Sequence, residues 1–309
     1  MTMNSDALNA MSPDDGRGDP VEERTDGSPL RMFLGVFAEN RLALVGLFIL
    51  GCLLLFCFVG PLIYETDQAR SNLANAALPP GAEGHPLGTD DVGFDVLGRL
   101  MEGGQASLQI GIAAALFATI FGALWGAIAA VIGGPVDAAM MRVVDGIASI
   151  PTLFLLIALA RMTTLSIPFL ILVLALLSWL GPARLIRGES LTIIGKEFVE
   201  AVRGMGGRSP RIVLRHVLPN TIGTIAVNAT FQVADAILAL AGLGYLGIGV
   251  PPPQPDWGSS LANGITFAYR GDWWLILPAG TAIVLVVIAF NFIGDGLRDA
   301  FFVKNRARS

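Results

Sequence analysis

Six long apolar stretches, separated by polar segments, divide the chain. About 20 predominantly apolar residues in a helix are needed to cross roughly 30 Å of hydrocarbon, and each stretch reaches that length. The pattern therefore predicts an all-α membrane protein with six transmembrane helices, near residues 42–64, 106–132, 142–162, 166–186, 221–249 and 274–297.

The polar segments organise the rest of the chain. Residues 1–30 are rich in Asp, Glu, Gly, Pro and Ser without apolar periodicity, which is typical of a disordered tail. Residues 31–105 are expected to hold a short surface helix, the first span and an outer loop. Residues 106–302 form the predicted core with the other five spans, and residues 303–309 form a short basic tail.

Lysine and arginine are unevenly distributed between the two sides of the predicted membrane. If the N-terminus is cytoplasmic, the inner segments hold sixteen of the twenty basic residues, and the outer segments hold only Arg70, Arg99, Arg161 and Arg270. Cytoplasmic segments of membrane proteins carry the excess of these residues. We therefore expect both termini and the 187–220 loop in the cytoplasm.

Composition agrees with a membrane protein, because only 15% of the residues are charged, against about 25% in soluble domains. Cys52 and Cys57 lie five positions apart in one apolar run, on different faces of a helix, so they cannot form a disulfide. The chain has two histidines, His85 and His216, and no metal-ligand spacing. Membrane lipid is an expected contact, whereas neither a metal nor a nucleic acid is expected.

Residues 197–220 form a polar island between apolar spans. Apolar residues recur at helical spacing from Phe198 to Met205, and the pair Gly206-Gly207 then ends the helix. Ser209 is expected as the N-cap of a second helix, with Pro210 at its first position. The pattern predicts two short helices joined at a glycine elbow. This unit is either a docking surface for a soluble partner or a solvated loop.

This island resembles the EAA loop of permease subunits of bacterial ABC importers. The matching residues are Glu200-Ala201-Val202, Gly206 and Leu218-Pro219 at the family's spacing, although Val202 replaces an alanine and His216 an isoleucine. The run 215–220 is similar to the dipeptide/oligopeptide branch of that family. Similar matches occur at 85–90, 244–258 and 291–299, so the resemblance covers about residues 31–302.

The resemblance implies a type I ABC importer permease fold in the bacterial cytoplasmic (inner) membrane. It implies a second permease subunit, one or two ATPase subunits and an extracytoplasmic solute-binding protein as partners. The expected solutes are dipeptides or oligopeptides, with nickel, haem or glutathione as alternatives. Glu200 is expected to meet a basic residue of the ATPase, and the residues implied in ATPase docking are Glu200, Ala201, Arg203, Gly206, Arg211, Leu218 and Pro219.

The sequence lacks the Gly-x-x-x-x-Gly-Lys-Ser/Thr loop that cradles nucleotide phosphates, and it lacks a nucleophile–His–acid set in a plausible pocket. We therefore expect a non-catalytic subunit that holds no cofactor of its own. ATP and Mg²⁺ are expected to bind to the partner ATPase subunits.

Polar side chains form a stripe along the fifth predicted span, where each would be costly if it faced lipid. The stripe predicts a translocation pathway lined by Asn228, Gln232 and Asp235, or alternatively hydrogen bonds between helices. In the third span, Asp145 is expected to pair with Arg142. A rival class is an ion-coupled secondary transporter with Asp145 or Asp235 as the relay, although no inverted repeat is visible.

The predicted outer segments are rich in turn-forming residues and aromatic residues. Asp90, Asp91 and Asp95 near His85 suggest either ordered turns or a cation site, and their spacing does not match an EF-hand. Small residues at Gly122 and Gly126 favour close helix packing. We expect tryptophans to mark the membrane interface at Trp257, Trp273 and Trp274.

Overall fold

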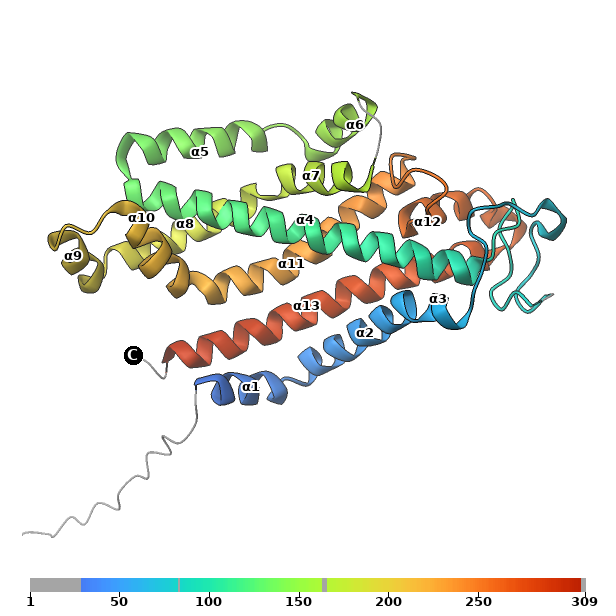
Figure 1. Ribbon diagram of the computed structural model, residues 1–309, viewed down its shortest axis with the longest axis horizontal. Coiled ribbons are helices and arrows are strands. Elements are labelled where there is room, and N and C mark those ends of the chain that lie inside the picture. The colour runs from blue at the N-terminus through green and yellow to red at the C-terminus, as the bar shows by residue number, and fades with distance from the viewer. Residues whose placement is uncertain (1–28, 83, 163–165, 307–309) are drawn as a thin grey trace, which may run out of the picture.

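The computed structural model describes residues 29–82, 84–162 and 166–306, and these are helical apart from loops and two isolated β-bridges. The long helices lie roughly along one common axis, and short helices lie at the two ends (Figure 1). Most of the predicted tail, residues 1–28, and the end of the basic tail, 307–309, lie outside the described residues. The all-α prediction is confirmed for the part of the chain described.

Membrane-capable helices are fewer than predicted. Four helical runs are long and apolar enough to cross a membrane in the described chain, and a bent pair brings the total to five. The four runs are Arg41–Phe58, Val96–Ile132, Ser209–Tyr245 and Trp273–Phe301, and the pair is α7 (Ile167–Ser178) with α8 (Leu180–Ile194), bent by 43°.

The third predicted span is not one continuous helix. It is divided into α5 (Gly134–Ala148) and α6 (Thr152–Met162), with a break around Pro151. A proline disfavours helical backbone at the preceding residue and cannot donate the next helical hydrogen bond. The prediction of an Arg142–Asp145 pair is wrong, because Asp145 pairs instead with Arg184 of α8 at 2.8 Å.

The longest helix, α4 (Val96–Ile132), runs along most of the length of the helical bundle (Figure 1). It begins ten residues before the predicted span, because the Oδ1 atom of Asp95 accepts the backbone N–H of Gly98 at 2.7 Å and caps the helix. Gly122 and Gly126 face α8, where a Cβ atom would come within 3 Å of the α8 backbone. This confirms the prediction of small-residue packing between helices.

The first and last long helices form an antiparallel pair. In α2 (Arg41–Phe58), a Cβ on Gly46 would lie 2.7 Å from the Ala289 carbonyl oxygen of α13 (Leu277–Arg306), so the two backbones touch. The short α1 (Pro29–Glu39) packs against the end of α13, with the rings of Phe33 and Phe301 4.8 Å apart. Cys52 is exposed and Cys57 buried, and both are free thiols, as predicted.

Helix α12 (Trp257–Ile265) lies among the loops at the end of the molecule where α4 begins (Figure 1). Its N-cap, Asp256, is fully buried and accepts the backbone N–H groups of Ser259 and Val250. Trp257 is only 1% exposed and donates to the Leu100 carbonyl of α4, so its placement at the membrane interface is wrong. Trp273 is exposed, as expected of an interface residue.

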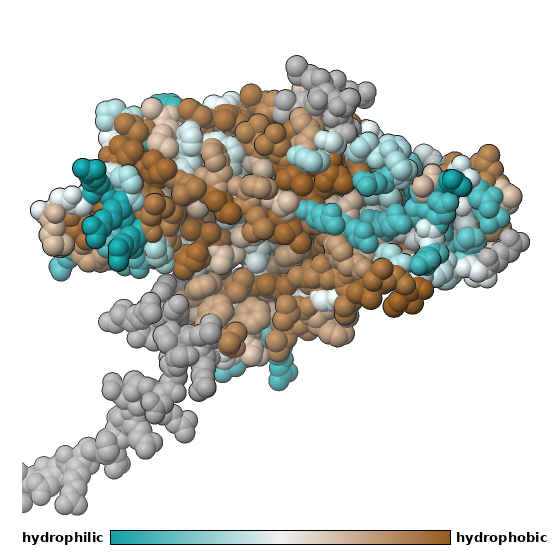
Figure 2. Space-filling view, viewed as in Figure 1, coloured by the Kyte–Doolittle hydropathy of each residue, from teal (hydrophilic) through white to brown (hydrophobic). Residues whose placement is uncertain are grey.

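Apolar side chains form both the core and much of the outer surface. Figure 2 shows apolar residues across the middle of the molecule and polar residues gathered mainly toward its two ends. Exposed phenylalanine and leucine side chains on α2 and α4 belong to this surface, including Phe48, Leu55, Phe117 and Phe121. Such a surface is favourable against lipid tails and costly against water.

Candidate functional site

The polar island folds as two short helices between α8 and α11 (Leu218–Tyr245), at one end of the molecule (Figure 1). The first is α9 (Glu197–Gly204), and the second is α10 (Ser209–Ile212), which continues through a π-helical turn into α11. The predicted glycine elbow is confirmed. The N-cap of α10 is Arg208 rather than the predicted Ser209, a shift of one residue.

The elbow is a Schellman motif, in which two backbone hydrogen bonds close the end of α9. The N–H of Gly207 donates to Val202 O and the N–H of Gly206 donates to Arg203 O, both at 2.9 Å. Gly206 has φ +80°, a left-handed conformation that side chains disfavour. Gly207 is required for space, since a Cβ there would lie 2.6 Å from Val202.

One face of this segment is buried against the transmembrane helices. Four apolar residues of the segment are at most 4% exposed and pack with side chains of α4 and α8: Val199, Ile212, Val213 and Val217. Each fully buried side chain of this size contributes about 1.5–3 kcal/mol relative to an exposed one. The segment is therefore attached firmly to α4 and α8 and moves with them.

The opposite face is open to solvent. Met205 is 80% exposed and Leu214 63% exposed, values that are unusual for apolar residues in a polar loop. Of the residues predicted to dock an ATPase, only Leu218 is half-buried, and the exposed ones are Glu200, Ala201, Arg203, Gly206, Arg211 and Pro219. The structure thus places the predicted docking residues on one protruding unit that combines charge with exposed apolar surface.

The polar stripe of α11 divides into parts with different surroundings. Gln232 is buried, and its Nε2 atom donates to the Ser178 carbonyl at 3.1 Å, where α7 and α8 bend. Asn228 is half-buried, and its Oδ1 atom has no hydrogen-bond partner among the described residues. Asp235 is exposed. The structure therefore does not bring the three predicted pathway residues into one environment.

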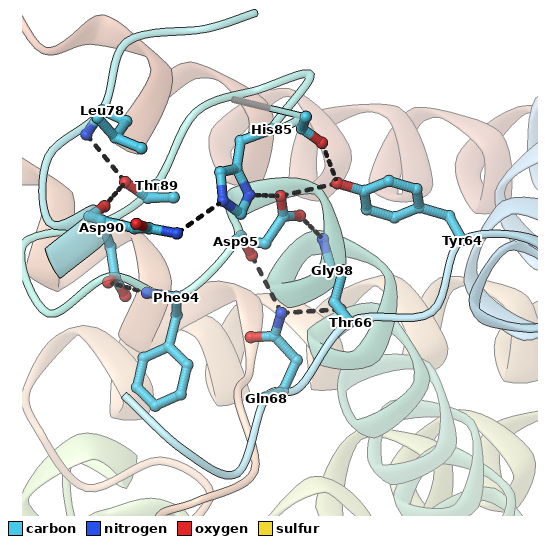
Figure 3. A network of polar contacts seen from close by, with 12 residues as sticks. Tyr64, Thr66, Gln68, Leu78, His85, Thr89, Asp90, Phe94, Asp95 and Gly98 are labelled. Carbon is cyan, nitrogen blue, oxygen red and sulfur yellow. Dashed lines mark hydrogen bonds and ion pairs between the residues drawn. The ribbon is translucent and has the colours of Figure 1, made fainter. Parts of the chain in front are cut away.

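A hydrogen-bonded network orders the loop at the other end of the molecule (Figure 3). Asp95 is its centre, because its Oδ2 atom lies 2.7 Å from His85 Nδ1 and accepts the Tyr64 hydroxyl at 2.9 Å. The side chain of Gln68 donates to the Asp95 carbonyl. Asp90 and Asp95 thus serve ordered turns, and no group able to hold a metal ion occurs among the residues described.

Burial changes the proton affinity of two groups in this loop. The pKa of Tyr64 is raised to about 12 by burial, with further contributions from its hydrogen bond to Asp95 and from the negative charge of that residue. Burial also raises the pKa of Asp90, while hydrogen bonds from the Phe94 and Val92 backbone and the nearby Arg99 act in the opposite direction.

Two family models match the chain. Residues 97–306 match the model described as binding-protein-dependent transport system inner membrane component, and residues 28–80 match the N-terminal TM domain of oligopeptide transport permease C. The first match covers α4 to α13, and the second covers α1, α2 and the start of the outer loop. Together they include residues 197–220 and every membrane-capable helix described.

Curated relatives agree with these matches over most of their length. The oligopeptide transport system permease protein OppC of Bacillus subtilis is 36% identical, with 87% of this chain and 88% of the relative covered. The dipeptide transport system permease protein DppC of Alkalihalophilus pseudofirmus is 35% identical, covering 96% and 97%. A putative peptide permease protein of Brucella suis is 42% identical, covering 88% and 90%. The chain therefore belongs to the family of inner-membrane components of binding-protein-dependent transport systems.

Proposed function

We propose that this chain is the permease subunit of an ATP-driven importer of dipeptides or oligopeptides, coupled through residues 197–220 to a separate ATPase. The observation that carries the proposal is the two-faced coupling segment, with one face buried on α4 and α8 and the other exposed. A segment with these two faces can transmit movement of a partner docked on its exposed face directly to the transmembrane helices packed on its buried face. The names of the curated relatives support peptides as the solute.

The proposed topology has six spans with both termini in the cytoplasm. The first two are α2 and α4, the third is the broken pair α5–α6, and the fourth is the bent pair α7–α8. The last two are α11 and α13. In support, α1 and the last turns of α13 lie at the same end of the molecule as α9 and α10 (Figure 1).

The proposed mechanism assigns binding of ATP and Mg²⁺ to partner ATPase subunits. A second permease subunit completes the pathway, and an extracytoplasmic binding protein delivers the solute. Closure of two ATPase subunits moves the docked segments together and opens the pathway outward, by rigid-body movement of packed helices. This chain performs no chemistry in that cycle. Nickel, haem or glutathione are alternative solutes for the same mechanism.

Uptake of labelled dipeptides by cells that depend on this chain tests the proposal. Glu200→Arg is expected to reduce uptake at least tenfold while the variant remains folded in the membrane. The substitution reverses the charge of an exposed side chain that is proposed to contact the ATPase. Glu197→Arg is the matched control, since it makes the same charge change in the first turn of the same helix. Normal uptake by Glu200→Arg would refute the proposed coupling.

The same assay distinguishes the proposed ATP-driven importer from an ion-coupled secondary transporter. An ion-coupled secondary transporter relying on Asp145 or Asp235 would continue uptake after ATP depletion and lose it when the proton gradient is dissipated. The proposed importer would lose uptake after ATP depletion and would retain it when the proton gradient is dissipated. Copurification of this chain with an ATPase subunit, measured in the same cells, gives independent support.

A further inference from the structure

We infer that Arg203 passes movement of the coupling segment to a hinge between α4 and α5, and that the Asp137–Arg187 ion pair connects this hinge to α8. The inference rests on the proposed function, because it follows force applied to α9 into the permease. It assigns Arg203 a contact inside this chain, in place of the docking contact that the sequence pattern implies.

The hinge consists of two consecutive glycines with positive φ. Gly133 has φ +69° and ψ −168°, a conformation available essentially to glycine alone, and Gly134 has φ +58°. Neither position is crowded, since a Cβ would meet nothing closer than 3.9 Å. The glycines are therefore required by the backbone conformation, which turns the chain sharply from α4 into α5.

The helix beyond this hinge is loosely held. Val144 is the one residue of α5 that is buried, and the helix ends at the break before Pro151. A helix with little buried surface, bounded by a glycine pair and a proline break, moves at low energetic cost relative to the core helices. Movement of α5 as a unit is thus possible without unpacking α4 or α8.

Arg203 connects α9 to the start of the hinge. Its Nη2 atom donates to the Val131 carbonyl at 3.2 Å. Val131 lies in the last turn of α4, where carbonyl groups have no helical donor, and a cation is favourable at that end of a helix. The contact therefore fixes α9 to the residue two positions before Gly133, so displacement of α9 acts directly on the hinge.

On the α5 side of the hinge, Asp137 links α5 to α8. It lies in the first turn of α5 and forms two hydrogen bonds of 2.5 Å with Arg187 of α8. Its side chain is 13% exposed, whereas both partners of the second α5–α8 pair, Asp145–Arg184, are about half exposed or more. The first pair is therefore better shielded from water and is the stronger link between α5 and α8.

The first test uses the complete transporter reconstituted in liposomes. Arg203→Gln is expected to lower solute uptake and solute-stimulated ATP hydrolysis at least fivefold, while the ATPase subunit still copurifies. Arg208→Gln is the matched control, because Arg208 is exposed in the same segment and its side chain forms no hydrogen bond or ion pair with the residues described; it should stay within twofold. Unchanged uptake by Arg203→Gln, or loss of the ATPase subunit, would overturn the inference.

The hinge and the ion pair are tested separately. Gly133→Ala is expected to reduce uptake at least fivefold, whereas Gly146→Ala, in open space within α5, should have little effect. Asp137→Arg and Arg187→Asp should each lower uptake, and their combination should restore at least half of the loss. Equal effects of the two glycine variants, or no restoration by the charge exchange, would contradict the assignment.

A measurement that needs no solute separates this inference from the proposed function. Spin labels at Ala139→Cys and Leu191→Cys, with Cys52 and Cys57 replaced by alanine, report the distance between α5 and α8. ATP should change this distance in the parent and leave it unchanged in Arg203→Gln, and an equal change in both would overturn the inference. Absence of peptide uptake by the parent, with the distance change intact, would reject only the proposed solute.

Discussion

Gln232 Nε2 lies 3.1 Å from the carbonyl oxygen of Ser178, and this contact joins α11 to the bend between α7 and α8. The bend has a local cause. Pro182 has no N–H, so it leaves the Ser178 carbonyl four residues earlier without its helical donor. In a membrane such a carbonyl must be satisfied by protein or by water in a cavity. The buried amide of Gln232 supplies the missing donor.

Gln232→Leu should therefore destabilise the protein, because it leaves the partly buried Ser178 carbonyl without a donor. The expected loss is about 1–3 kcal/mol, seen as a lower thermal unfolding midpoint of the purified protein in detergent. Asp235→Asn on the same helix is the control, since Asp235 is exposed and should tolerate the change with little loss of stability. Equal stability of both variants would show that the contact contributes nothing.

Asp256→Ala should be among the most damaging single substitutions. Its carboxylate is fully buried and accepts hydrogen bonds from Val250 N and Ser259 N. Loss of an N-cap costs about 0.5–2 kcal/mol, and the unpaired Val250 N–H adds a further penalty. Thermal unfolding and the amount of folded protein in membranes should both fall, while Asp272→Ala, at a half-buried loop position, serves as the control.

The sequence carried enough signal to predict the helical class, the two short helices within residues 197–220 and the glycine elbow between them. Apolar length alone locates α2, α4, α11 and α13, because spans of this length have few alternatives in a membrane. The signal was insufficient where a proline lies inside an apolar stretch. Pro151 breaks one predicted span and Pro182 bends another, yet hydropathy treats both as ordinary members of the run.

Residue partners across the fold were less predictable than elements. Helical spacing suggested that Asp145 pairs with Arg142, but Arg184 approaches from another helix. No local pattern indicates that Arg203 meets Val131, since 72 residues separate them. The deep burial of Trp257 follows from the Asp256 cap and from Gly104, where a Cβ would lie 2.7 Å from the Trp257 ring. Such contacts depend on how helices assemble, which residue spacing does not determine.

Substitution of either glycine of the elbow by alanine should impair the elbow, for a different reason at each position. Gly206→Ala places a side chain in a left-handed conformation, which costs about 1–2 kcal/mol although the space around it is open. Gly207→Ala keeps an allowed conformation but collides with Val202, so the end of α9 must shift. Gly204→Ala is the control, because Gly204 is helical, exposed and uncrowded, and alanine favours a helix. Dipeptide uptake should fall in both elbow variants and be retained in Gly204→Ala. A Cβ on Gly207 would meet both the Val202 side chain at 2.6 Å and the Val202 carbonyl oxygen at 2.7 Å. The additional change Val202→Ala, which restores the alanine of the EAA pattern, removes only the first of these contacts, so it should recover uptake for Gly207→Ala in part and leave Gly206→Ala impaired. Recovery of both variants would show that crowding, rather than backbone conformation, determines the elbow.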